Sequence, residues 1–181
     1  MFFASDNTSG VPAEILAALS RANDGYTRSY GADALMDQVR DQVRTLFEAP
    51  EAAVYLVATG TAANALALAC YCPPWTAVFC HRHAHIAEDE CGAPEFFSNG
   101  AKLVLVEGAH GKMDPAALRT ALDRTGGSVH GVQKGALSLT NVTEAGTVYT
   151  PAELGQLTAI ARAHGLPCHL DGARFANALA A

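Results

Sequence analysis

The sequence contains no apolar run that approaches the roughly 20 residues that a membrane-spanning helix needs. Its start, MFFASDN, lacks the basic flank and the long apolar stretch of a secretory signal. Half of the 181 residues are hydrophobic and 17% are charged, which is typical of a soluble globular chain long enough for one domain with a real core. We therefore expect a protein that does not associate with a membrane.

Positive charge is scarce. Twelve Lys and Arg residues stand against eighteen Asp and Glu residues, which gives a formal net charge of −6, and no basic run offsets this balance. The composition therefore argues against nucleic acid as a partner. Lysine itself occurs only as Lys102, Lys112 and Lys134, which restricts any chemistry that needs a lysine amine.

Paired cysteine motifs are also missing. The cysteines are odd in number, contain no CxxC spacing and stand mostly among apolar neighbours. Such cysteines are typical of reduced thiols, so we predict a cytoplasmic protein. They are Cys70, Cys72, Cys80, Cys91 and Cys168.

Apolar segments alternate with helical patterns from Ala52 onward. The apolar segments predict strands over 53–58, 76–80, 102–107, 135–141 and 166–170. Helices are predicted over 61–70, within 86–98, over 114–124 and over 150–164. The strands are too apolar to alternate face by face, which is typical of a parallel sheet covered on both sides. The sequence thus predicts an α/β fold.

The residues before this alternation differ in character. A polar arm over 1–11 precedes a helix that Pro12 opens, and Asp33 can cap a second helix whose apolar stripe should face the core. That stripe consists of Leu35, Val39, Val43 and Leu46. We predict an arm with helices over 1–50 and a ligand-binding sheet domain over 51–181.

Two motifs stand next to predicted strands. LDGAR places Asp171 at the carboxyl end of a strand and Arg174 one turn later, where α/β sheets bind ligands. An acid there could bind a cationic group of a ligand, although a structural helix cap paired with Arg174 explains the same residues. TGTAAN at 59–64 suits a single phosphate at a helix N-terminus, and a tight turn with a threonine cap is the alternative. Without a P-loop or GxGxxG, ATP and NAD are disfavoured.

The densest polar run is HRHAHIAEDE at 81–90. His81, His83 and His85 alternate and would share one face of a strand, as a zinc site could use. The apolar strand ends by Cys80, however, and a loop gives no common face, so we predict no metal. A neutral imidazole in this run could instead accept or donate a proton.

Taken together, these motifs resemble the threonine aldolases, a family of fold-type-I pyridoxal-phosphate enzymes. The likeness spans residues 3–181 and includes DECGAPE at 89–95 and GTVYTPAEL at 146–154. It implies a three-layer fold with helices on both faces of a parallel-rich sheet. That fold is the large domain of the aspartate-aminotransferase-like transferases, here incomplete, and the implied cofactor is pyridoxal 5'-phosphate.

The resemblance also implies a role for each candidate site residue. The cofactor-binding residues would be Gly60, Thr61, His85, Asn141 and Asp171. The catalytic residues would be His85 and His130, and the substrate-binding residues would be Ser5 and Arg174. One departure is visible, because Ala4 stands before Ser5 where the family has an arginine.

For the intact protein, the resemblance implies an aldolase that cleaves L-threonine or a related β-hydroxy-α-amino acid to glycine and an aldehyde. Its substrate would be a small amino acid. The fold's sites usually lie between subunits, and Tyr30-Gly31 matches a family pair that lies near a neighbouring subunit. A homo-oligomer, either a dimer or a tetramer, is therefore implied.

The lysine that holds the cofactor as a Schiff base has no counterpart here. None of the three lysines stands in the right place, and in the family this lysine falls beyond the position of Ala181. We therefore expect the chain to be the amino-terminal part of a longer enzyme and inactive by itself. Three alternatives remain open: another lyase or aminotransferase on the same scaffold, a non-catalytic truncated paralogue, and a zinc-binding module.

Overall fold

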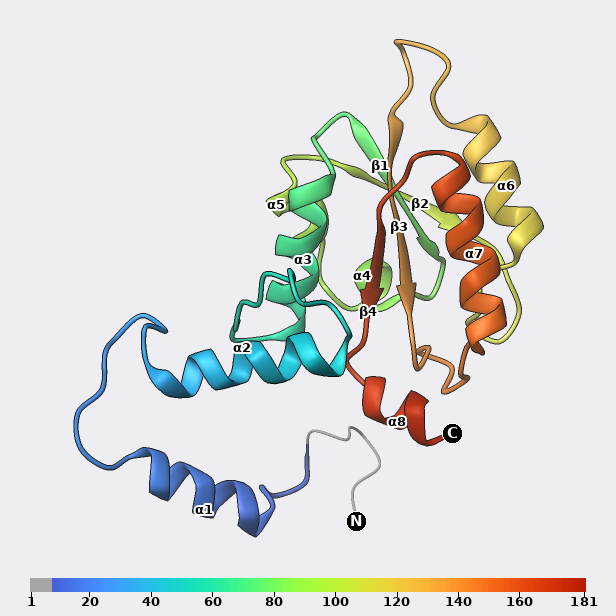
Figure 1. Cartoon of the computed structure of the whole chain (residues 1–181). Helices are drawn as coiled ribbons and strands as arrows, with labels where there is room; N and C mark the ends of the chain where they lie inside the picture. The colour runs from blue at the N-terminus through green and yellow to red at the C-terminus, as the bar shows by residue number, and fades with distance from the viewer. Residues whose placement is uncertain (1–7) are drawn as a thin grey trace. The chain divides into compact units, whose positions relative to one another are not determined.

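A computed structural model of the chain describes residues 8–181 (Figure 1). The chain divides into one unit that ends at Leu56 and a second unit that runs from Val57 to Ala181. The first unit contains helix α1 (Ala13–Ala22) and helix α2 (Ala34–Leu46). The predictions for both helices are confirmed. Asp33 caps α2, because its Oδ1 accepts the Met36 main-chain N–H at 2.9 Å.

The apolar stripe of α2 does not behave as predicted. Neither α1 nor α2 carries a buried residue, and Leu35 and Leu46 are 55% and 66% exposed. The prediction that this stripe faces a core is therefore wrong for this unit. A helix buries an apolar stripe only against another apolar surface, and residues 8–56 of the first unit contain no sheet that could supply one.

The strand predicted over 53–58 is also absent. This segment has no regular structure, and Tyr55 and Leu56 are 83% and 70% exposed. The apolar composition was a sound reason to expect a strand, but a strand persists only when a neighbour pairs with its main chain. No described strand of the chain pairs with 53–58.

The second unit is built on a sheet of four parallel strands in the order β2-β1-β3-β4. The strands are β1 (Thr76–His81), β2 (Lys102–Val106), β3 (Gln133–Thr140) and β4 (Cys168–Asp171). All six residues of β1 are buried, as expected for a central strand. The last residues of β3 and β4, Thr140 and Asp171, are paired.

Helices cover both faces of this sheet (Figure 1). On one face lie α6 (Pro115–Arg124) and α7 (Pro151–Ala163). On the other lie α3 (Gly60–Tyr71), α4 (His85–Glu88) and α5 (Ala93–Phe97). This arrangement confirms the predicted three-layer α/β fold.

The two layers of helices enclose two separate apolar clusters. The cluster beneath α6 and α7 includes Phe79, Leu118, Leu122, Leu137, Leu157 and Ile160. The cluster beneath α3 includes Leu68, Cys72, Val78, Cys80, Ile86 and Ala136. Alternate residues of β1 and β3 therefore point into opposite clusters, which accounts for strands that are apolar on both faces.

Local sequence signals set the helix ends. Thr150 and Glu153 form a capping box at the start of α7, and the Asp114 side chain caps α6 by accepting the Ala117 main-chain N–H at 2.8 Å. The single helix predicted within 86–98 is instead the two short helices α4 and α5. Gly92, at φ +74, lies between them in a left-handed conformation that no helix interior accommodates.

A short helix, α8 (Phe175–Ala180), follows β4. Over residues 8–181, none of the helices has the length and apolar character needed to cross a bilayer.

Candidate active site

The site begins with Asp171, the last residue of β4, which is only 8% exposed. Its Oδ1 accepts the Ala173 main-chain N–H at 3.1 Å, and its Oδ2 accepts an N–H of the Asn64 side chain at 3.0 Å. Both donors are neutral, so they satisfy the two carboxylate oxygens without adding a positive charge. Asp171 is thus suited to a cationic partner.

Asn64 lies on α3, one turn after the helix begins, and sequence reasoning missed it. Its Nδ2 also donates to Oε1 of Glu90, at 2.8 Å. The amide therefore joins two carboxylates that are far apart in the sequence. A usable signal was present, because Asn64 follows Gly60 by four residues and so lies on the same helix face as the glycine turn.

The start of α3 is the proposed phosphate turn. Thr59 caps this helix, since its Oγ1 accepts the Ala62 main-chain N–H at 3.1 Å. The threonine cap expected as the alternative is thus present. The main-chain N–H groups of Gly60 and Thr61 have no carbonyl acceptor within the helix, because they belong to its first turn. They point outward from its N-terminal end. No atom lies within 4 Å of where a Cβ on Gly60 would stand, so the turn has open space beside it.

His85 is the first residue of α4, and its Nδ1 lies 3.2 Å from Oε1 of Glu90. The imidazole is 36% exposed, whereas the Glu90 side chain is fully buried. Because an ionised Glu90 can only accept, this contact suits the imidazole tautomer that carries its proton on Nδ1 and a lone pair on Nε2. The second oxygen of Glu90, Oε2, is buried without a hydrogen-bond partner among the described residues.

These residues form one continuous series: His85, Glu90, Asn64 and Asp171. They come from α4, the segment after it, α3 and β4, and they lie beside the turn at Gly60. The donor set fits a ligand with a phosphate at one end and a protonated aromatic nitrogen at the other. The glycine turn offers amides for the first, and the buried carboxylate offers charge for the second.

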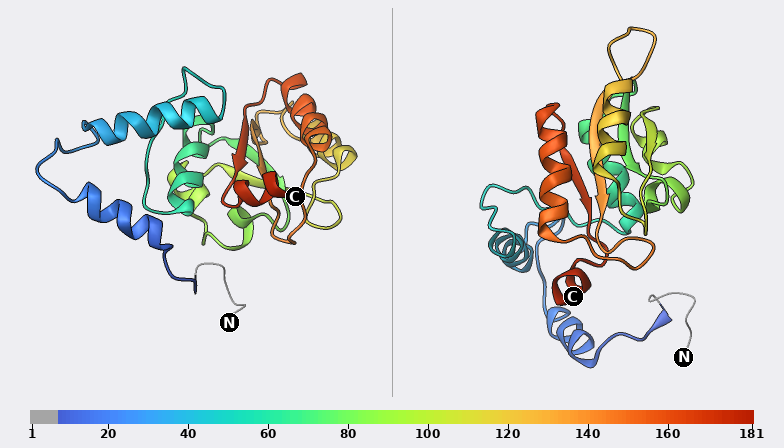
Figure 2. Two further views of the ribbon diagram at one scale, coloured as in Figure 1. Left: turned by 60° about the horizontal axis from the view of Figure 1, so that its bottom comes forward. Right: turned by 90° about the vertical axis from the view of Figure 1, so that its right-hand side faces the viewer.

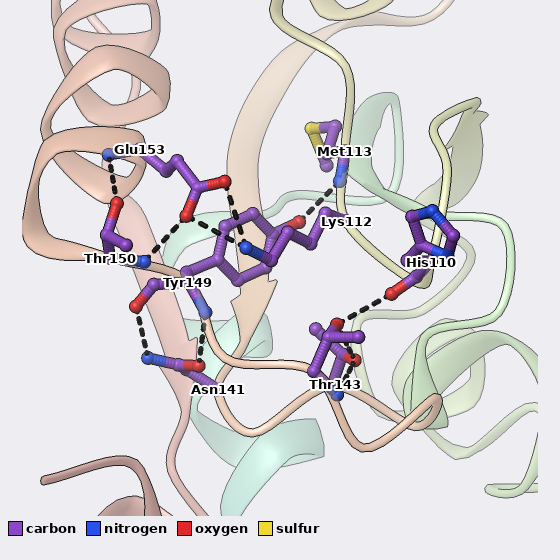
Figure 3. Close-up of polar contacts among 9 residues, drawn as sticks. His110, Lys112, Met113, Asn141, Thr143, Tyr149, Thr150 and Glu153 are labelled. Atoms are coloured by element: carbon purple, nitrogen blue, oxygen red, sulfur yellow. Dashed lines mark hydrogen bonds and ion pairs between the residues drawn. The ribbon is translucent and has the colours of Figure 1, made fainter. Parts of the chain in front are cut away.

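Asn141 follows the end of β3 and is 7% exposed. Its main-chain N–H donates to the Asp171 carbonyl at 3.0 Å. Its side chain holds the Tyr149 main chain at two points (Figure 3): Oδ1 accepts the N–H at 3.0 Å, and Nδ2 donates to the carbonyl at 3.3 Å. The amide expected to contact a cofactor thus fixes the 141–149 loop at the edge of the site.

Tyr149 extends this support toward the segment after β2. The Met113 main-chain N–H donates to its hydroxyl (Figure 3), and burial raises the pKa of that phenol to about 12. The Lys112 ammonium lies 5.6 Å from the centre of the Tyr149 ring and 2.9 Å from both Glu153 carboxylate oxygens. Lys112 is therefore committed to an ion pair at the start of α7.

His169 is a second residue that sequence reasoning missed. It precedes Asp171 by two residues in β4, so both side chains lie on the same face of the sheet. Its Nδ1 lies 2.9 Å from the Ser138 hydroxyl. Burial lowers the pKa of this imidazole, and the Asp171 charge opposes that shift in part.

The resemblance also predicted three further candidate residues, His130, Arg174 and Ser5. His130 is exposed in the loop between α6 and β3, which projects beyond the amino-terminal end of the strands (Figure 2, right). It therefore lies at the opposite end of β3 from Asn141. Arg174 is half-buried and is the N-terminal boundary residue of α8, three residues after Asp171. Ser5 lies outside the described residues.

The other histidines of the polar run have main-chain or surface partners. His81 is buried, its Nδ1 accepts the His83 main-chain N–H at 3.1 Å, and its Nε2 lies 3.2 Å from the Gly108 carbonyl. His83 pairs with Glu88 at 2.9 Å. Within residues 8–181, no three His, Cys, Asp or Glu side chains gather in a metal-binding group.

Comparisons with known proteins show which family the chain resembles. The family model described as beta-eliminating lyase matches residues 3–181. The low specificity L-threonine aldolase of Pseudomonas aeruginosa is 47% identical over 179 residues, which are 98% of this chain and 51% of that protein. A protein of the same name from a Pseudomonas species is 45% identical over the same shares. The chain thus spans about half the length of these curated relatives.

A solved structure gives the same result. The threonine aldolase of Leishmania major is 34% identical and superposes with a TM-score of 0.89, over 95% of this chain and 49% of that chain. The resemblance predicted from the motifs is confirmed by these similarities, as is the predicted fold.

Proposed function

This chain belongs to the beta-eliminating lyase family, and from that membership we propose that its intact protein is a pyridoxal-phosphate-dependent aldolase. It would cleave L-threonine or a related β-hydroxy-α-amino acid to glycine and an aldehyde. Threonine aldolases and beta-eliminating lyases depend on pyridoxal phosphate. The observation that carries the proposal is the buried series from His85 to Asp171 beside the turn at Gly60.

When bound, pyridoxal phosphate supplies an electron sink for the carbanion left at the α-carbon of an amino acid. The Asp171 carboxylate would keep its ring nitrogen protonated, because an anion next to that nitrogen favours the cationic form. The amides of Gly60 and Thr61 would bind its phosphate. Asn141 would border the ring from the end of β3.

His85 would accept the β-hydroxyl proton of the substrate. Its Nδ1 donates to Glu90, so Nε2 is the atom that carries a lone pair. The guanidinium of Arg174, one turn beyond Asp171, would bind the substrate α-carboxylate, for which its planar fork is suited. Ser5 would contribute to the same recognition.

His130 is proposed as a second proton-transfer residue on the resemblance alone. Its position at the amino-terminal end of β3 gives no support for action within the same chain. The variant His130→Asn, compared with wild type for turnover of L-threonine, tests this assignment. A turnover equal to wild type would remove His130 from the mechanism.

The experiment that tests the function uses the intact protein with pyridoxal phosphate and L-threonine. We expect acetaldehyde and glycine in equal amounts. Pyruvate from L-serine or L-cysteine would instead support a β-eliminating lyase, and amino transfer to a 2-oxo acid would support an aminotransferase. No turnover of any of these substrates would favour a non-catalytic paralogue.

We also propose that the protein is a cytoplasmic homo-oligomer, either a dimer or a tetramer. Large apolar side chains more than half exposed on the second unit support an oligomer. They are Leu66, Tyr71, Trp75, Phe96, Phe97, Val129 and Leu179. Five free thiols support a reducing compartment. Sedimentation of the intact protein would give its oligomeric state.

A further inference from the structure

The Asn64 side-chain amide has two hydrogens, and both are used. Its Nδ2 lies 2.8 Å from Oε1 of Glu90 and 3.0 Å from Oδ2 of Asp171. All three residues are buried, with exposed fractions of 6%, 4% and 8%. We propose that Asn64 is a positioning residue that holds these two carboxylates in one fixed arrangement for cofactor binding. This inference rests on the proposed function.

The first reason is electrostatic. Because both acceptor oxygens bond the same nitrogen, they lie within about 6 Å of each other, a separation at which like charges disfavour one another. A donor shared between them offsets that repulsion. Over residues 8–181, no other side chain is hydrogen-bonded to both Asp171 and Glu90.

The second reason is that the bridging donor is neutral. A lysine or arginine at this place would also join the two acids, but its charge would neutralise Asp171 and compete with a cationic ring nitrogen. An amide fixes the Asp171 oxygen and leaves its charge available. The Asn64 amide therefore orients the Asp171 carboxylate without taking the place of a cationic ring nitrogen.

The third reason is the link to His85. The Glu90 oxygen that accepts the Asn64 amide also accepts the His85 Nδ1–H, at 3.2 Å. A change in the orientation of Glu90 therefore changes which imidazole nitrogen carries the proton. Asn64 acts on His85 through Glu90 and on the ring-nitrogen site through Asp171, without contact to either reacting group.

The test compares Asn64→Leu, which keeps similar volume but has no donor, with Asn64→Ser, which keeps one donor hydrogen. The matched control is Ala65→Gly. Ala65 is the next residue on α3 and is 1% exposed, and the substitution weakens the helix without removing a polar contact. Any effect of general destabilisation would appear in the control as well.

The first measurement uses the cofactor-free 181-residue chain. Nitrogen-15 signals of the imidazoles report which ring nitrogen is protonated, and the His85 signals are identified by their loss in His85→Asn. We expect the Nδ1-protonated form in wild type and in Ala65→Gly, and a mixture of both forms in Asn64→Leu and Asn64→Ser. This readout needs neither the cofactor nor activity.

The second measurement is the dissociation constant of the intact protein and its variants for pyridoxal phosphate, obtained by equilibrium dialysis. We expect binding about tenfold or more weaker in Asn64→Leu, a smaller loss in Asn64→Ser, and a value within about threefold of wild type in Ala65→Gly. Wild-type His85 signals together with wild-type affinity in Asn64→Leu would overturn the inference. An intact wild-type protein that binds no pyridoxal phosphate would count against the proposed function, and the imidazole signals would still decide the role of Asn64.

Discussion

The Lys112 ammonium lies 2.9 Å from each carboxylate oxygen of Glu153 and so joins the segment after β2 to the first turn of α7. One of these oxygens also accepts the Thr150 main-chain N–H, at 2.7 Å. This main-chain hydrogen bond, followed by the bond from Lys112, lowers the pKa of Glu153 to about 2. The contact is therefore made by a carboxylate over almost the whole pH range.

The first prediction concerns this carboxylate. A carboxyl group whose pKa falls on folding contributes stability above its unfolded value of 4.5, and that contribution is lost as pH falls toward about 2. We expect Glu153→Gln to be less stable than wild type at pH 7 and equally stable near pH 2, as measured by urea unfolding. The exposed Glu144→Gln control should follow wild type throughout. If the free energy of unfolding of Glu153→Gln and that of wild type changed with pH in parallel, the expectation would be contradicted.

The second prediction concerns the loop fixed by Asn141. Asn141→Ala removes both hydrogen bonds to the Tyr149 main chain. The buried N–H and carbonyl of Tyr149 are then left without these partners. We expect a loss of about 1–3 kcal/mol in the free energy of unfolding. Asn177→Ala, an exposed asparagine of α8, should change it by less than about 0.5 kcal/mol. Equal losses in the two variants would show that the Tyr149 contact is not stabilising.

The third prediction concerns pH and His169. Burial lowers the pKa of this imidazole from its usual 6.5, so the native state favours the neutral form. The resulting stability is complete above pH 6.5 and is lost as pH falls through the lowered pKa. His169→Asn should flatten the decline of the thermal midpoint below pH 6.5. His110→Asn, at an exposed histidine, should leave the slope unchanged, and an unchanged slope in His169→Asn would be evidence against a neutral buried imidazole.

The fourth prediction concerns proton transfer in the intact protein. His85→Asn should lower kcat for L-threonine by about 10²–10⁴-fold, the usual contribution of a general base. His83→Asn is the matched control, because His83 stands two residues away and pairs with Glu88 on the surface. Acetaldehyde release measures both variants. The assignment of His85 is lost if the two variants release acetaldehyde at the same rate.

Much of the fold was readable from local patterns. The capping signals at Asp33, Asp114 and Thr150 each gave the correct start of a helix, because a cap depends on residues within one turn. Buried strands such as β1 were readable from their unbroken apolar runs. The segment 53–58 has the same apolar character and is not a strand, because pairing is a property of two segments and a run shows only one.

The candidate site divides in the same way. Asp171 and Gly60 were predicted as site residues because each stands where a strand ends or a helix begins, whereas His85 was predicted from the family resemblance. Asn64 was missed, because its place on the helix face shared with Gly60 does not show which side chains lie opposite it. Glu90 ends the polar run at 81–90, and its bond to Asn64 cannot be read from that run.

The amino-acid sequence by itself determined the order of strands and helices along the chain, the helix caps and the family resemblance. These features depend on short-range patterns and on motifs such as LDGAR. Tertiary structure alone decided that Asn64 bonds both Glu90 and Asp171, that Asn141 holds Tyr149, and that His130 stands at the far end of β3. The physical reason is that the parallel sheet brings carboxyl ends of strands to one edge, whereas the pairing of side chains across that edge depends on packing of α3 and α4 against it.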